Sequence, residues 1–203
     1  MNRKLRFSKI YFLGLVLTFM LFLCTGRQVY THLTINYAED PSGDAFVTVY
    51  GENGVLHEGM VEEGKADLFF WGSDITGISP IHYNTFEEIC LESIQIRVHG
   101  EIVAKMDGEA ILKYFTPNDG IQEMKLCEQG VSLTTRSDQP VMQLSSQLCD
   151  QIDRMAVFMS SLNLFFYVMV WTFIYWYLFR VLDLKNDRSY GNLLDGVLGL
   201  VGI

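Results

Sequence analysis

The chain has 203 residues, of which 49% are hydrophobic, and carries 15 Lys and Arg against 24 Asp and Glu, a formal net charge of −9. This balance argues against nucleic acid or anionic lipid headgroups as direct partners, because like charges repel at long range. The residues between the two apolar stretches described below suffice for one domain with its own core, but not comfortably for two.

The amino terminus combines a basic flank with an apolar stretch. Residues 1–9 contain four Lys or Arg and precede the apolar run Ile10–Cys24, which predicts a first transmembrane helix over residues 10–26 with the basic end in the cytoplasm. A secretory signal peptide has the same layout, so cleavage stays open as the alternative. The long apolar run and the lack of an Ala-x-Ala site favour an uncleaved anchor.

Strand patterns follow in residues 27–154. Residues 29–37 alternate, with Leu33, Ile35 and Tyr37 on one face and His32 and Thr34 on the other. Strands at 45–50 and 55–61 flank Asn53-Gly54, a dipeptide typical of tight hairpin turns. Further strands are predicted at residues 66–71, 93–98, 101–106, 121–126, 131–135 and 141–144. This spacing of strands and turns predicts an antiparallel β-sandwich.

One short helix interrupts the strands. Residues 108–115 read as helical, with Asp107 placed to cap the first amides and Pro117 to stop the helix. The fold predicted for residues 27–154 is therefore mainly β with one short helix.

Aromatic residues at 69–71 provide the candidate ligand contact. In the predicted strand 66–71, Leu68 and Phe70 share one face, and Phe69 and Trp71 share the other. Core packing explains most aromatic residues, but flat exposed rings also bind the apolar faces of sugars. Trp71 is therefore the first candidate for contact with a glycan or a protein partner.

Chemistry-bearing residues form no recognisable signature. The sequence has no GxSxG, HExxH, P-loop or Rossmann glycine pattern. The histidines, at positions 32, 57, 82 and 99, are scattered, and Glu39, Asp40 and Asp44 lack the ligand spacing of a calcium loop. We therefore predict no catalytic residue, no metal and no cofactor, and favour a binding or scaffolding protein over an enzyme.

Three cysteines, Cys90, Cys127 and Cys149, lie between the apolar stretches, and Cys24 lies in the first of them. An odd number cannot pair completely. A disulfide between Cys90 and Cys127 is compatible with an extracytoplasmic location, but the sequence leaves the pairing open.

Residues 156–179 contain no formal charge and predict a second transmembrane helix. At about 1.5 Å per residue they span roughly 36 Å, enough to cross a hydrocarbon layer of about 30 Å. Asn163, an amide costly to bury in lipid, is the candidate helix contact, either with the first anchor or with another subunit. The alternative is that its side chain snorkels to the interface or pairs with its own backbone. Tyr175, Trp176 and Tyr177 predict an aromatic belt at the interface.

The charges flanking these stretches predict the topology. Arg180, Lys185 and Arg188 follow the second stretch, so both termini are predicted in the cytoplasm, including the tail 180–203. Residues 27–154 carry 8 Lys or Arg against 21 Asp or Glu, a net charge of −13, and are predicted outside. The apolar residues 193–203 are too few to cross a bilayer; they either lie at the interface or begin a further span.

The chain resembles the front portion of bacterial polytopic glycosyltransferase-like proteins that build cell-surface polysaccharides. The resemblance rests on FVTVYGENG (residues 46–54), LESIQIRVHGE (91–101) and DGEAILKYF (107–115), followed by a late strand and an aromatic membrane helix. It implies a multi-pass membrane protein, seated in the lipid bilayer, that binds or scaffolds components of cell-envelope glycan assembly.

Two alternatives accompany that function. Because the resembling proteins continue into many more spans, this chain could be a truncated or split part of a polytopic transferase acting with a membrane protein partner. A sensor of an external ligand is disfavoured, since the predicted cytoplasmic ends are small.

Overall fold

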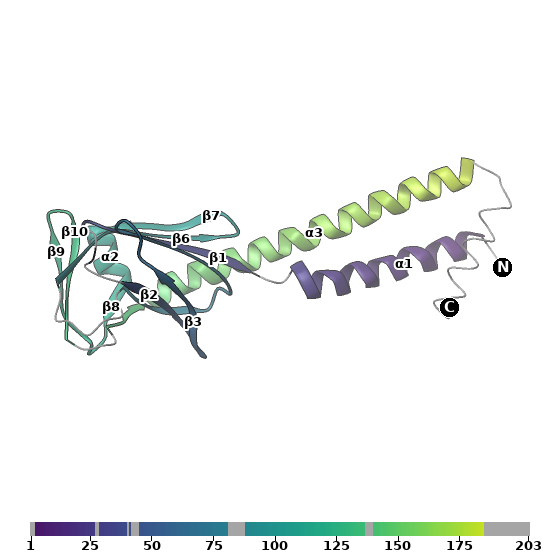
Figure 1. The fold of residues 1–203 in the computed structure, drawn as a ribbon. Coiled ribbons are helices and arrows are strands. Elements are labelled where there is room, and N and C mark those ends of the chain that lie inside the picture. Colours follow the sequence, from purple (N-terminus) through teal and green to yellow (C-terminus); the bar gives the residue numbers. More distant parts are fainter. Residues whose placement is uncertain are drawn as a thin grey trace. The chain divides into compact units, whose positions relative to one another are not determined.

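The computed structural model describes residues 3–26, 29–39, 41, 45–80, 88–136 and 140–184. It divides the chain into two compact units: a helical unit, Met1–Arg27 with Ser161–Ile203, and a β domain, Gln28–Ser160 (Figure 1). Predictions for Asp40, Asp44, His82 and residues 185–203 lie outside the described residues. So do those for the side chains of residues 1–9 and of Arg180.

Two antiparallel sheets make up the β domain. The first has the order β4 (Lys65–Trp71), β1 (Tyr30–Tyr37), β6 (Glu88–Val98), β10 (Gly130–Thr135) and β9 (Ile121–Cys127), and β7 (Glu101–Asp107) also pairs with β6. The second has the order β3 (Gly54–Met60), β2 (Phe46–Gly51), β5 (Ile75–Ser79), β11 (Met142–Leu144) and β8 (Phe115–Pro117). The predicted mainly antiparallel β fold is confirmed.

Both sheets contribute to one hydrophobic core. The alternation read from β1 is confirmed, because Leu33, Ile35 and Tyr37 are buried, and β4 likewise buries Leu68 and Phe70. These side chains share a cluster with residues of the second sheet and of both helices that reach the domain. The inward faces therefore hold the two sheets together by burying apolar surface.

The helix α2 (Gly108–Tyr114) confirms the predicted short helix and its start at Gly108, but it ends one residue before the predicted Phe115. Asp107 occupies the N-cap position without a side-chain capping hydrogen bond. The helix ends because Phe115 takes an extended conformation, with φ −121° and ψ 141°, and begins β8. Pro117 lies within β8, beyond the helix end, so its predicted role as the stop is wrong.

The long helix α3 (Ser146–Leu184) begins well before the predicted span at 156. Residues 147–154, which precede the predicted span, belong to this helix. Leu148, Ile152 and Ala156 recur every four residues and are all buried in the core of the β domain. The first turns of α3 are therefore part of the domain rather than a linker.

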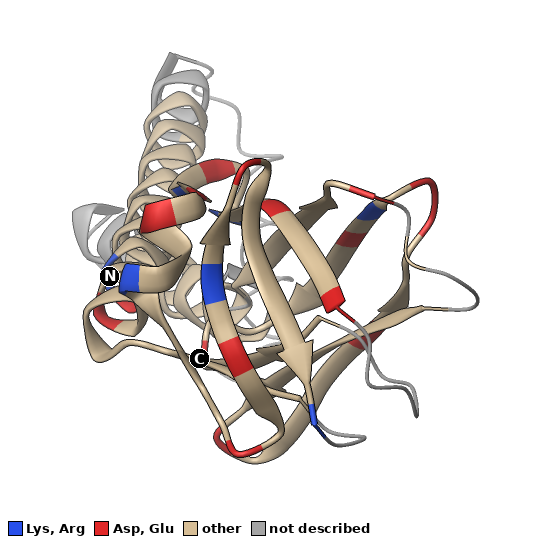
Figure 2. Cartoon of the chain, turned by 90° about the vertical axis from the view of Figure 1, so that its left-hand side faces the viewer, with Lys and Arg blue, Asp and Glu red and all other residues tan. Residues whose placement is uncertain are grey.

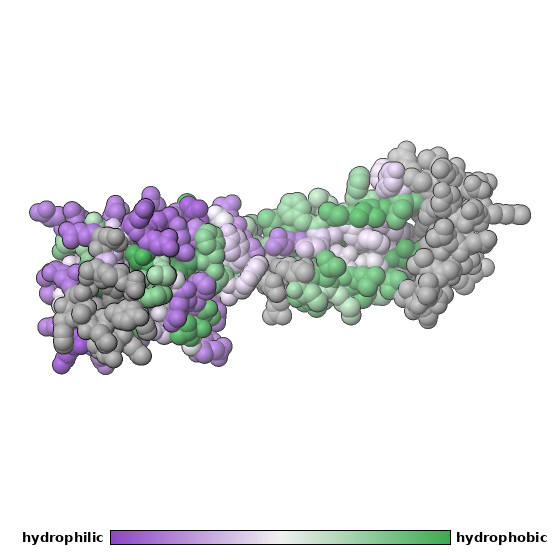
Figure 3. Space-filling view, in the orientation of Figure 1, coloured by the Kyte–Doolittle hydropathy of each residue, from purple (hydrophilic) through white to green (hydrophobic). Residues whose placement is uncertain are grey.

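One described helix region is long and apolar enough to cross a membrane, namely Ser146–Leu178. A shorter apolar helix covers Ile10–Cys24, within α1 (Arg3–Leu21) and the π-helical η1 (Phe22–Gly26). On the face shown in Figure 3, hydrophobic residues predominate along the two helices and hydrophilic residues over the β domain.

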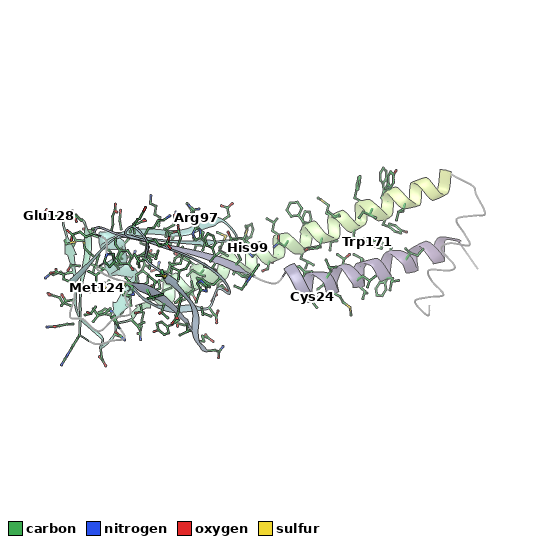
Figure 4. All side chains as sticks on the ribbon, in the orientation of Figure 1. Cys24, Arg97, His99, Met124, Glu128 and Trp171 are labelled. Atoms are coloured by element: carbon green, nitrogen blue, oxygen red, sulfur yellow. The ribbon has the colours of Figure 1, made fainter. Side chains whose placement is uncertain are left out.

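Within the helical unit, α1 and α3 interlock at Gly14. A Cβ atom on Gly14 would lie 1.7 Å from Cζ2 of Trp171, so only glycine leaves room for the indole ring. The Trp171 Nε1–H donates a hydrogen bond of 3.2 Å to the backbone oxygen of Tyr11 (Figure 4). One helical turn beyond Trp171, the Tyr175 ring also contacts α1, with its centre 4.7 Å from that of the Tyr11 ring. Small residues at such a contact allow close helix packing.

Candidate functional site: an aromatic face on β1 and β4

The edge strand β4 presents two aromatic side chains to solvent. Phe69 is 53% and Trp71 69% exposed, while Leu68 and Phe70, at the alternate positions, are buried in the core. The predicted alternation of this strand is thus confirmed. Exposed rings this large, in adjacent outward positions, are unusual on a domain surface.

The neighbouring strand β1 adds rings to the same face. Cross-strand pairing sets Tyr30 opposite Trp71 and His32 opposite Phe69. The His32 and Phe69 rings stack at 3.8 Å, and the Tyr30 ring lies 6.2 Å from both Phe69 and Trp71. We call these four residues, Tyr30, His32, Phe69 and Trp71, the aromatic face.

A carboxylate borders the aromatic face. Asp67, one outward position before Phe69, accepts hydrogen bonds from Thr34 Oγ1 at 2.8 Å and lies 3.1 Å from His32 Nε2. It also forms an ion pair with Lys65. Partial burial acts to raise the pKa of Asp67, but the contacts with Lys65, Thr34 and His32 together lower it. Asp67 is therefore a fixed anionic acceptor beside the rings.

This carboxylate gives a prediction for pH dependence. Because its pKa is lower in the folded protein, Asp67 stabilises the fold at neutral pH and loses that contribution as the pH falls through its folded-state pKa. Asp67→Asn should reduce stability at pH 7 and flatten the loss on acidification below about pH 4. Chemical denaturation of the wild type and the variant at pH 7 and below about pH 4 measures the two changes in stability. The exposed Asp119→Asn is the control, and an equal effect there would contradict the assignment.

Two polar atoms lie unpaired at the edge of the aromatic face. His99 and Gly100 form the β6–β7 turn, and both have positive φ, 51° and 87°. The turn places the His99 ring 6.0 Å from that of Tyr30. Among the described residues, the buried His99 Nε2 and Arg97 Nε have no hydrogen-bond partner (Figure 4). Most buried polar atoms have a hydrogen-bond partner, so these two are exceptions in the β domain.

A depression adjoins the other end of this surface. It has a volume of about 770 Å³ and is lined by Met60, Glu62, Glu63, Lys65 and Asp67. Since Lys65 and Asp67 lie on β4 with the aromatic residues, the depression and the aromatic face share one strand. Rings and hydrogen-bonding groups therefore follow one another along β4.

Asn163, the other predicted contact, belongs to the helical unit and not to this surface. It is half-buried and lies at four-residue spacing from Tyr167, Trp171 and Tyr175. Trp171 and Tyr175 contact α1 through Tyr11, whereas the Tyr167 ring lies 6.4 Å from that of Phe22 in η1. Each four-residue step turns about 40° around an α-helix, so this spacing alone does not put Asn163 on the face that packs against α1. Its contact with α1 therefore stays a prediction.

Metal-ligating side chains do not gather in the described part of the chain. No group of three or more His, Cys, Asp or Glu residues there could hold an ion. His57 lies away from the aromatic face, with its ring 6.0 Å from that of Phe70. Of the described histidines, His99 approaches Tyr30 and His32 stacks on Phe69.

Tyr30, His32 and Asp67 were not singled out as site residues from sequence. Alternation along β1 does place His32 outward, and β4 alternation places Asp67 beside Phe69. The missing information was the pairing of β1 with β4, which joins residues more than 30 positions apart. No family of proteins matches the chain, and no curated protein is similar to it.

Proposed function

We propose that this protein is a membrane-anchored binding protein that holds a glycan of the cell envelope on its aromatic face. The observation that carries the proposal is the pair of exposed rings Phe69 and Trp71 beside the hydrogen-bonding group of Asp67. Sugar rings combine apolar C–H faces with hydroxyl groups. The C–H faces can pack on the aromatic rings, and the hydroxyl groups can donate hydrogen bonds to the neighbouring carboxylate. We propose that the protein binds the glycan and does not catalyse a reaction on it.

Electrostatics narrows the class of glycan. Asp and Glu residues occur in many strands and turns of the β domain (Figure 2), and residues 27–154 carry a net charge of −13. A strongly anionic polysaccharide would be repelled on approach. A neutral or amine-bearing glycan suits the surface better.

The proposed anchorage uses both helices. The long apolar helix supports one span, and the interlock of Gly14 with Trp171 supports α1 as a second, antiparallel span packed against it. Lys and Arg at both ends of the sequence favour cytoplasmic termini, which puts residues 27–154 outside. On this proposal Asn163 contacts α1 rather than another subunit.

Trp71→Ala tests the binding site. We expect roughly tenfold weaker retention of a neutral polysaccharide fraction from the cell envelope, because the truncation removes the largest exposed ring. Binding of the detergent-solubilised full chain to the immobilised fraction gives the affinity, and circular dichroism confirms that the fold is kept.

The matched control is Val55→Ala, which removes exposed apolar surface from β3, away from the aromatic face. Its affinity should equal that of the wild type. Equal affinity of the Trp71 variant, or a wild type that retains no polysaccharide, would contradict the proposed function.

The resemblance to polytopic glycosyltransferase-like proteins leads to the alternative proposal that the chain is one part of a split transferase. The aromatic face would then hold the growing glycan for a partner that performs the transfer. The two proposals differ in one observable: in mild detergent, a second multi-span protein would co-elute with the chain.

A further inference from the structure

We propose that Cys90 and Cys127 form a disulfide bond that ties the edge strand β9 to the central strand β6. Their Sγ atoms lie 2.8 Å apart without being bonded. That separation is less than 1 Å longer than a disulfide bond of about 2.05 Å. The inference rests on the proposed function in one respect, since the bond persists only if the β domain lies in an oxidising compartment.

The local fold explains how residues on two unpaired strands meet. β10 lies between β6 and β9, and Cys127 pairs with Gly130 at the end of the β9–β10 hairpin. A Cβ atom on Gly130 would lie 2.0 Å from the backbone oxygen of Leu91, the residue after Cys90. Only glycine allows this end of the hairpin to approach β6 so closely, and the approach brings Cys127 to Cys90.

The other two cysteines have different surroundings. The Cys149 thiol is 3.5 Å from the backbone oxygen of Ile75, and burial followed by the nearby Asp153 charge raises its pKa. Cys24 belongs to η1 in the helical unit. The geometry therefore selects one pair and leaves Cys24 and Cys149 as thiols.

The reaction is a thiol–disulfide exchange with a disulfide-bearing oxidant. One cysteine thiolate attacks the disulfide of the oxidant, which releases one thiol and forms a mixed disulfide. The second cysteine thiolate then attacks the first cysteine's sulfur and releases the other thiol of the oxidant. The protein loses two electrons and two protons, and the oxidant leaves as two thiols. Burial and the adjacent Cys127 sulfur raise the pKa of the Cys90 thiol to about 12, so the exchange should be slow at neutral pH and faster in mild alkali.

The test uses the full chain in detergent, reduced, desalted and then incubated with oxidised glutathione. After denaturation and alkylation, mass spectrometry should find that two of the four cysteines are not alkylated because they form a disulfide. After reduction, all four should be alkylated. Peptide mapping should recover Cys90 joined to Cys127. The oxidised form should melt about 10 °C above the reduced form, because the crosslink constrains the unfolded chain.

Matched variants separate this pair from chance oxidation. Cys149→Ser should keep the bond and the higher melting temperature, whereas Cys90→Ser and Cys127→Ser should each abolish both. Failure of the wild type to form the bond with oxidised glutathione, or pairing that involves Cys149, would overturn the inference.

Alkylation of intact cells before lysis tests the location separately. If Cys90 and Cys127 are not alkylated in the cells, the result supports both the disulfide and the proposed extracytoplasmic placement. If the bond forms readily with glutathione but the thiols are free in cells, the pairing stands and the placement is wrong.

Discussion

Gly130→Ala should destabilise the β domain by about 3–5 kcal/mol, a sum of backbone strain and overpacking. Gly130 has φ +146°, and its added Cβ would lie 2.0 Å from Leu91 O and 3.0 Å from Glu92 Cα. Both neighbours are backbone atoms of β6, so no side-chain rotation relieves the clash. Chemical denaturation of the detergent-solubilised protein, followed by near-ultraviolet circular dichroism, measures the loss.

Gly54→Ala is the control for this prediction. Gly54 also has a positive φ, +118°, but nothing lies within 4 Å of its added Cβ. It should therefore cost only the backbone strain, roughly 1–2 kcal/mol. Equal losses at the two glycines would show that β10 does not approach β6 as described.

Ile152→Ala should cost about 2–5 kcal/mol of β-domain stability, the usual range for truncating a fully buried isoleucine. Ile152 is 0% exposed and lies in the part of α3 that joins the core. The adjacent Gln151 is exposed on the same helix. Denaturation of both variants in detergent measures how strongly this helix turn supports the sheets.

The expected change for Gln151→Ala is within about 0.5 kcal/mol, as for other exposed positions. A similarly small change for Ile152→Ala would mean that residues 147–154 act only as a connection between the sheets and the apolar part of α3. A large difference between the two neighbours would instead establish the helix as a component of the domain.

Strand alternation accounts for most of what could be predicted of the fold. Leu33 and Ile35 on β1 and Leu68 on β4 repeat with period two because one face is buried and the other is not. β5 and β8 were missed: β5 is short and buries Ile75 and Ile78 on a largely covered strand, and β8 has three residues directly after a helix. Such segments offer too few residues for a period to emerge.

The site was predictable only in part, for a similar reason. Alternation placed Phe69 and Trp71 on one face of the strand and Leu68 and Phe70 on the other, but it did not show which of the two faces is exposed. The addition of Tyr30 and Asp67 depends on strand pairing, which reflects packing of the whole domain rather than any local pattern. The helical start of α3 was obscured by the polar residues between Leu148 and Ile152.

The seat of Trp171 against Gly14 bears on proteolytic maturation. Under the proposed anchorage, a signal peptidase that removed α1 would also remove Tyr11, whose carbonyl accepts the indole hydrogen bond. The N–H group would be stranded in hydrocarbon, where an unmet donor costs several kcal/mol. On this proposal α1 and α3 are required together. A chain cleaved after α1 would need a helix from another protein to accept the Trp171 hydrogen bond.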